Sequence, residues 1–441
     1  MSLSINAAGM PRHADLLGVK PGWRSVGYAA IAMILALNVL DIVPPLQDYG
    51  DWVYQGFLLK LLMAGHGVLV TFKPWPVPNA LSQLILAADM FLVSPIVAAK
   101  TFICVYLVLF ALLCDRLTTA RDGSRFVLLV LLGVVNSTFW NGYVNFQLGL
   151  LILLFYVCLR REGRHLPLPV EMLFGVSIFF SHAICLGAFL VYVGCDSLLR
   201  RRLARGFAVL APALLLVVWY ALANSSTTPD VPPLGHGGLA AFASYKLYTM
   251  AKLGPYQNFI VDGVGDHTRH ALLYGAGVLV NFGFALLFVV PLSLCAIAMM
   301  VRRQFTPEVM TALICFGGFL ILPSTLFGIV NIGERALAVT AVLAVIAVKL
   351  PDWTLRSGAA LACLMPLTIV SVLAGTIGVT HDRPLSSAAI NDPHQRNRLL
   401  FWHRAFEFLD EVQMAQRSAL SGTPPTSLPG FDTSILARRG G

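Results

Sequence analysis

Apolar segments recur along nearly the whole chain, separated by short polar or basic stretches. A helix needs roughly 20 apolar residues to cross the hydrocarbon core of a bilayer. The pattern therefore predicts an all-α, polytopic transmembrane bundle of about 11 spans, within a range of 9–13. Several segments have only about 14 residues, so we expect bent or interrupted helices. The predicted spans are residues 25–43, 95–114, 126–139, 141–159, 169–181, 183–199, 206–222, 271–301, 308–328, 335–349 and 357–379.

Basic residues between the apolar segments give the spans a direction. Arg and Lys gather in short runs at 160–164, 200–205 and 302–303, as the positive-inside rule predicts for cytoplasmic loops. The mostly polar residues 1–24 then lie in the cytoplasm, and the first span is interpreted as an uncleaved signal anchor.

The first external loop, residues 44–94, contains two further apolar stretches, at 54–72 and 80–93. Both are marginal for crossing, and Lys60 and His66 interrupt the first, so we predict helices that lie along the outer leaflet or dip into it. The predicted domains are a cytoplasmic segment at 1–24, a transmembrane domain at 25–380, and an external tail at 381–441 that is partly helical and then disordered.

Composition excludes an ordinary soluble domain, because 57% of the 441 residues are hydrophobic and only 12% are charged. The net charge of +9 comes largely from the basic loops, so we do not expect nucleic acid as a partner. The eight cysteines lie in or beside apolar segments without a CxxC pair, which is typical of small core residues.

The motif PPLQDYGDW, residues 44–52, follows the first span directly and would emerge beside the lipid headgroups. Asp48 and Asp51 are three residues apart on one side of a helical turn. They could share a general-base role, hold a divalent metal ion or join a hydrogen-bond network. The alternative is that both only cap the following helix. No other cofactor is indicated, since there is no P-loop, HExxH or GxGxxG motif.

A second motif, WNGYVNFQLG at residues 140–149, lies between two short predicted spans. It offers amide, hydroxyl and aromatic groups that suit sugar rings or lipid headgroups. The alternative is a tight helix–helix turn within an aromatic belt. His182 lies at another external helix junction, where it is either a site residue or a packing residue; no Ser–His–Asp triad can be assigned.

Charged residues complete the external side of the predicted bundle. Glu334 and Arg335 begin a span, where they either neutralise one another or present a cation to phosphate. Lys246 and Lys252, among tyrosines in the second external loop, suit an anionic headgroup or belong to an interfacial amphipathic helix.

Taken together, these motifs resemble the C-type superfold of glycosyltransferases (GT-C), and in particular a bacterial branch of it. The resemblance covers roughly residues 25–380 and rests on PPLQDYGDW, the NGYxNFxLG pattern, Ser181-His182 and Glu334-Arg335. Two features differ from the superfold. Tyr49 and Gly50 separate two carboxylates that are usually adjacent, and the large soluble domain of oligosaccharyltransferases is absent.

The resemblance implies a multi-pass enzyme of the bacterial inner membrane that takes a sugar from a polyprenyl-phosphate donor. It implies Asp48 as the catalytic base and Asp51 as its helper. Lys246, Lys252 and Arg335 would bind the lipid phosphate. The substrate-binding residues would be Trp52, Trp140, Asn141, Tyr143, Asn145, His182 and Glu334.

Two other classes of protein would use the same spans. One is a transporter or flippase for a lipid-linked or small polar substrate, and the other is a non-catalytic assembly protein of envelope polysaccharide synthesis. Charged residues are scarce within the predicted spans and polar groups gather on one face, which favours the enzyme. Membrane lipid is the expected partner in every case, and the sequence identifies no protein partner.

Overall fold

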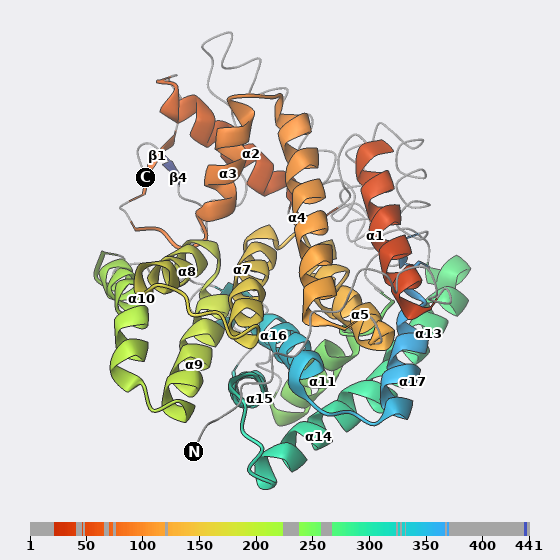
Figure 1. Ribbon diagram of the computed structural model, residues 1–441. Coiled ribbons are helices and arrows are strands. Elements are labelled where there is room, and N and C mark those ends of the chain that lie inside the picture. The colour runs from red at the N-terminus through yellow and green to blue at the C-terminus, as the bar shows by residue number, and fades with distance from the viewer. Residues whose placement is uncertain are drawn as a thin grey trace, which may run out of the picture.

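The computed structural model describes residues 22–40, 46, 49–65, 70–73, 76–119, 122–223, 238–256, 267–322, 325–326, 329–330, 332–366, 368–369 and 436–438. Within this part the chain is helical apart from two short pairs of strands (Figure 1). The predicted all-α class is therefore confirmed at this coarse level.

The first half of the chain contains α1 (Trp23–Leu40), α2 (Tyr49–Met63), β1 (Val70–Phe72), α3 (Leu81–Met90), α4 (Pro95–Leu117), α5 (Gly123–Leu129), the π-helix η2 (Val130–Val134), α6 (Ser137–Trp140), α7 (Val144–Arg161), α8 (Leu168–Ser181), α9 (Ala183–Leu199) and α10 (Leu203–Ala223). The second half contains α11 (Gly238–Ala251), α13 (His267–Phe284), the π-helix η3 (Ala285–Val289), α14 (Val290–Val301), α15 (Pro307–Ile321), β2 (Thr325–Leu326), β3 (Ile329–Val330), α16 (Ile332–Ala347), α17 (Asp352–Ala362) and β4 (Leu436–Arg438).

Five helical stretches of the described chain are long and apolar enough to cross a membrane, which indicates a membrane protein. Two of the five contain a π-helical turn. Five further apolar helices are shorter. The five long stretches are Pro95–Leu117, Gly123–Trp140, Val144–Arg161, Leu203–Ala223 and Gly275–Val301.

Helix starts follow the local sequence. Ser94 caps α4 by accepting a hydrogen bond from the backbone N–H of Val97, and Thr306 caps α15 by accepting one from Val309. A proline follows each capping residue at the first helical position, where its missing N–H has no consequence.

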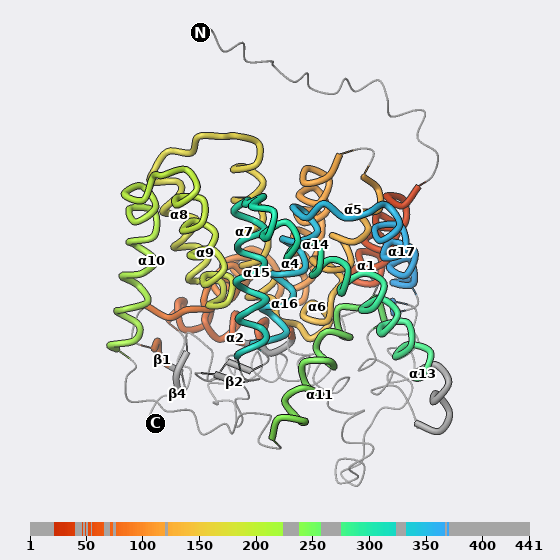
Figure 2. Tube along the Cα trace, turned by 90° about the horizontal axis from the view of Figure 1, so that it is seen from below, coloured from red at the N-terminus to blue at the C-terminus, as the bar shows by residue number. Residues whose placement is uncertain are grey.

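One end of the bundle, here called the basic end, is held together by the basic loops. Arg24 at the start of α1 bonds to Asp115 near the end of α4, and Arg160 near the end of α7 contacts carboxylates at the start of α8 and the end of α9. Arg125 at the start of α5 donates to the backbone carbonyl of Val348, just beyond α16, at 3.0 Å. The α7–α8 connection lies at the upper edge of Figure 2, whereas α2, β1 and α11 lie toward the lower edge, at the opposite end.

Central and peripheral helices differ strongly in burial. About 83% of the apolar stretch through α5, η2 and α6 is buried, against 17% of α10. Figures 1 and 2 both show α10 at the margin of the bundle. Gly133, in η2, allows close packing, because a Cβ there would lie 2.6 Å from the Phe110 ring.

Two sequence predictions differ from the structure. The helix predicted at 54–72 ends at Met63, since the chain turns at Gly65 with φ of 77°, and Val70–Phe72 then forms a strand. This strand pairs antiparallel with Leu436–Arg438, which belongs to the tail segment predicted to be disordered. The predicted helical part of the tail lies outside the described residues, and so does the last part of the span predicted at 357–379.

Candidate functional site

A partly buried ion pair joins α11 to α16 at the opposite end of the bundle. Glu334, in the first turn of α16, is 4% exposed. Its Oε2 lies 3.2 Å from Nζ of Lys252, which directly follows α11, and its Oε1 accepts a hydrogen bond from the hydroxyl of Ser137 in α6. Three segments that are distant in sequence therefore meet at one carboxylate. Lys252 thus balances the charge of Glu334.

Arg335, next to Glu334 in the sequence, contacts an aromatic ring. Its guanidinium carbon is 4.1 Å from the centre of the Tyr143 ring, close enough for a cation–π contact. Tyr143 is the N-cap residue of α7, so the second motif contacts the Glu334-Arg335 motif here. Arg335 itself is 9% exposed.

His182 forms the one-residue junction between α8 and α9. Its Nδ1 accepts a hydrogen bond from the backbone N–H of Ile184 at 3.1 Å, so the proton of the neutral ring is on Nε2. Burial lowers the pKa of His182 well below its ordinary value, and the positive charge of Arg335 lowers it further. The ring is therefore neutral at pH 7 and offers an N–H donor.

The charge of Lys252 is maintained by its partner. Burial pushes the pKa of Lys252 down, but the Glu334 carboxylate and two nearby tyrosines outweigh this effect and leave the pKa above its usual value. Lys252 is thus an ammonium at neutral pH, and Nζ can act as a fixed positive charge at this end of the bundle.

Three of the predicted site residues carry buried donor groups. The indole N–H groups of Trp52 and Trp140 and the amide nitrogen of Asn145 have no hydrogen-bond partner among the residues that the structure describes. The Asn145 oxygen does accept a hydrogen bond, from the Ser82 hydroxyl of α3. Buried unpartnered donors are costly, and they are typical of places where a polar ligand or water completes the bonding.

The remaining predicted site residues are Asp48, Asp51, Asn141 and Lys246. Asp48 lies outside the described residues, and Asp51 is placed in the first turn of α2 without a described side chain. Asn141 is 5% exposed at the end of α6. Lys246 Nζ donates to the carbonyl oxygen of Leu322 at 2.6 Å, beyond the last turn of α15, which is a helix-capping contact.

A small, partly open apolar cavity begins next to the cluster. Leu253, adjacent to Lys252, lines it, and so does Leu337, one turn beyond Glu334 on α16. Along α16 the lining runs from Leu337 to Ala344, which is about 10 Å of helix. The remaining lining residues are Val289, Leu292, Ser293, Ala296, Ala312, Leu313, Phe316, Thr340 and Ala341.

Sequence reasoning missed Ser82 and Ser137, the two serines that bind the predicted site residues. Ser137 is separated from Glu334 by 197 residues, and Ser82 from Asn145 by 63. A signal for Ser137 is its position beside Asn136, which caps α6 immediately before the second motif. No feature of the sequence around Ser82 indicates its contact with Asn145.

A divalent metal ion suits this cluster poorly. Among the described residues no group of three or more His, Cys, Asp or Glu side chains could hold a metal. The carboxylate of Glu334 already binds an ammonium and a hydroxyl, which would compete with a metal for both oxygens.

Comparison of the chain with protein-family models, with curated proteins and with solved structures finds no match in any of the three.

Proposed function

We propose that this protein is an integral-membrane glycosyltransferase of the bacterial inner membrane, which moves a sugar from a polyprenyl-phosphate donor to an acceptor on the non-cytoplasmic face. In this proposal the chain crosses the bilayer about 11 times, the basic end faces the cytoplasm, and α2 and α3 lie along the outer leaflet.

One observation carries the proposal: a buried cationic cluster adjoins an apolar cavity. Lys252 and Arg335 supply positive charge, and the cavity starts at the next residue, Leu253. A polyprenyl phosphate has the same two parts, an anionic headgroup and a long apolar chain. The unpartnered N–H groups of Trp140 and Asn145 suit the hydroxyls of a sugar beside the phosphate.

The proposed reaction is a direct displacement at the anomeric carbon. The acceptor hydroxyl oxygen forms the new bond as the bond from the anomeric carbon to the phosphate oxygen breaks. Asp48, assisted by Asp51, removes the acceptor proton, and the departing phosphate keeps the electron pair. Lys252 and Arg335 stabilise the negative charge that develops on the phosphate.

The test is sugar transfer by the purified full-length protein from a polyprenyl-phosphate sugar donor. Asp48→Asn removes the base at constant size, so we expect transfer to fall about 10²–10⁴-fold with unchanged thermal stability. We expect Asp51→Asn to reduce sugar transfer by a smaller factor. Asp352→Asn, at an exposed position in the first turn of α17, removes the same charge at the basic end and is the matched control.

Full transfer by the Asp48→Asn protein would remove Asp48 from the mechanism. Loss of transfer in Asp352→Asn to the same extent would show that the effect is one of net charge.

A transporter or flippase is the second candidate, because π-helical turns make two membrane-length stretches locally irregular and transporters use irregular membrane helices. The two functions differ in bond cleavage. A flippase in proteoliposomes would move the intact lipid-linked sugar across the bilayer, whereas a glycosyltransferase would release the polyprenyl phosphate.

A further inference from the structure

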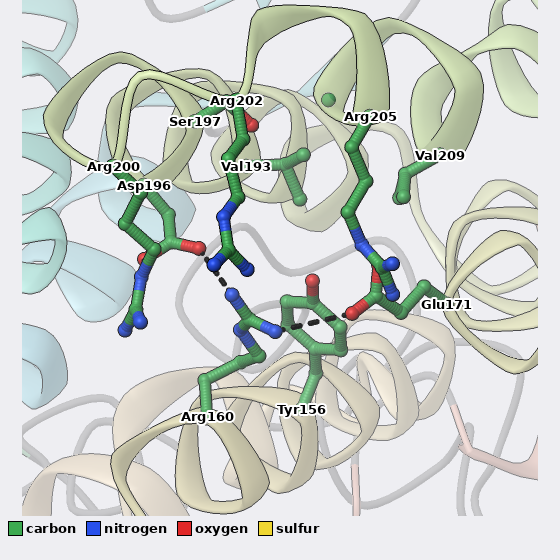
Figure 3. Close-up of a pocket in the computed structure, with 11 residues that line it drawn as sticks. Tyr156, Arg160, Glu171, Val193, Asp196, Ser197, Arg200, Arg202, Arg205 and Val209 are labelled. Carbon is green, nitrogen blue, oxygen red and sulfur yellow. Dashed lines mark hydrogen bonds and ion pairs between the residues drawn. The ribbon is translucent and has the colours of Figure 1, made fainter. Parts of the chain in front are cut away.

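A second polar site lies at the basic end, between α7, α8, α9 and α10, far along these helices from the cluster of Glu334. It is a small pocket that is open at its mouth. Figure 3 shows its lining, in which arginine side chains enter from opposite walls. The lining residues are Tyr156, Arg160, Glu171, Val193, Asp196, Ser197, Arg200, Arg202, Arg205, Gly206 and Val209.

Three arginines form ion pairs with the two carboxylates of the pocket. Arg160 lies at the base with 11% of its side chain exposed, 3.1 Å from Glu171 Oε1 and 2.6 Å from Asp196 Oδ2. Arg205 takes the other oxygen of Glu171 at 3.2 Å, and Arg200 takes the other oxygen of Asp196 at 2.6 Å. Every carboxylate oxygen in the pocket therefore already binds one guanidinium.

Arg202 is the fourth arginine, and its guanidinium points into the pocket (Figure 3). Its side chain makes no hydrogen bond or ion pair with the described part of the chain, and the Nε of Arg160 is also buried without a partner there. Four guanidinium groups against two carboxylates leave the pocket with a net charge of +2. An anion with several oxygens, such as a phosphate, would satisfy these donors in the bidentate geometry that arginine favours.

The surroundings of the pocket indicate where such a phosphate comes from. Arg202 immediately precedes α10, whose outward residues Leu203 and Phe207 are 51% and 71% exposed. This apolar face continues along α10 to Leu222, which is 74% exposed, so a chain lying against it would run along the length of the helix. A phosphate in the pocket and acyl chains on α10 together match one membrane phospholipid.

We propose that the pocket binds the headgroup of an anionic phospholipid, with Arg202 as the main contact to its phosphate and α10 as the support for its acyl chains. The ion pairs of the pocket hold α7, α8, α9 and α10 together. The positive charge that these pairs do not neutralise is available to bind the lipid phosphate. The site does not depend on the proposed sugar transfer, and its test has no activity readout.

The experiment measures lipid binding to the delipidated full-length protein in a neutral detergent by native mass spectrometry. The probes are dioleoyl phosphatidylglycerol, dioleoyl phosphatidylcholine and inorganic phosphate. We expect phosphatidylglycerol to bind well above the other two. Arg202→Gln should weaken its binding about 10- to 100-fold, because a charge-assisted contact to phosphate is lost.

Arg302→Gln is the matched control, since it removes one exposed arginine that caps α14 at the same end of the bundle, outside the pocket. It should leave phosphatidylglycerol binding near the wild-type value. The lipid-free Arg202→Gln protein should unfold at the wild-type temperature, because no bond within the described chain is removed. Equal losses in both variants would overturn the site, and so would wild-type binding by Arg202→Gln. Equal binding of inorganic phosphate and phosphatidylglycerol would overturn the lipid assignment.

Discussion

Glu334 and Lys252 show what a charged residue needs in the interior of this protein. Taking either charge out of water alone would cost several kcal/mol, and each carries the partner that offsets this cost. The pair also leaves Glu334 Oε1 available to Ser137, so one carboxylate fixes the start of α16 against both α11 and α6. An ion pair of this kind fixes the relative positions of the helices more than it raises the free energy of unfolding.

His182 makes folding stability depend on pH. Because its folded pKa lies well below that of the unfolded chain, the unfolded state binds a proton first as pH falls below about 6.5. The contribution of His182 to stability is therefore fully present at pH 7 and above, and it is lost on acidification by at most about 1.4 kcal/mol per pH unit. We expect the unfolding temperature of the wild type to fall between pH 7 and pH 5, and His182→Asn to reduce that fall while still capping α9.

The exposed His165 provides the comparison, because His165→Asn replaces a histidine whose side chain lies in solvent. The unfolding temperature of that variant should fall between pH 7 and pH 5 as much as that of the wild type. Identical pH profiles for His182→Asn and the wild type would contradict the assignment of a neutral, buried imidazole.

At the level of elements, α14 has one face in the apolar cavity and one face outward. Ala296 lines the cavity and is 2% exposed, whereas its neighbour Ile297 is 47% exposed. Ala296→Phe should fill the end of the cavity that is distant from Lys252 and shorten the space for an apolar chain. If the cavity holds the polyprenyl tail, the KM for a long-chain donor should rise about tenfold, with a smaller change for a donor of two isoprene units.

Ile297→Phe adds the same ring to the outward face of the same helix and should leave both KM values near wild type. An equal KM change for long and short donors would place the tail elsewhere.

Element positions could be predicted where the information is local. The span predicted at 183–199 coincides with α9, because an apolar run of that length is bounded by a capping residue and a basic turn. The strand Val70–Phe72 could not be predicted, since its partner is Leu436–Arg438 and nothing near 70–72 indicates it. Among site residues, Tyr143 and Arg335 both belong to motifs that the sequence analysis singled out, but the serine partners of Glu334 and Asn145 depend on contacts between distant segments. The base assigned to Asp48 stays a prediction.

For the whole molecule, the separation of the basic end from the cluster of Glu334 carries a prediction about membrane orientation. Arg205 lies at the basic end, bonded to Glu171, and α10 then leads away from it. A topology reporter fused after Arg205 should therefore report the cytoplasm, and one fused after Asp230 the non-cytoplasmic side.

Fusions after Arg116 and Arg302 extend the test to other loops of the basic end and should match the fusion after Arg205. Reporters after Arg205 and Asp230 on the same side would mean that α10 does not cross, and the orientation of every later helix would reverse.

The pairing of β1 with β4 has a consequence for the order in which the protein is made. Thr71 pairs with Ala437, which is synthesised 366 residues later, and at roughly 5–20 residues per second that interval is about 20–70 s. Until then β1 presents an open backbone edge beside the loop that follows α2. Among the described elements β4 emerges from the ribosome after all others, so this edge closes only when the helices between the two strands have already been inserted.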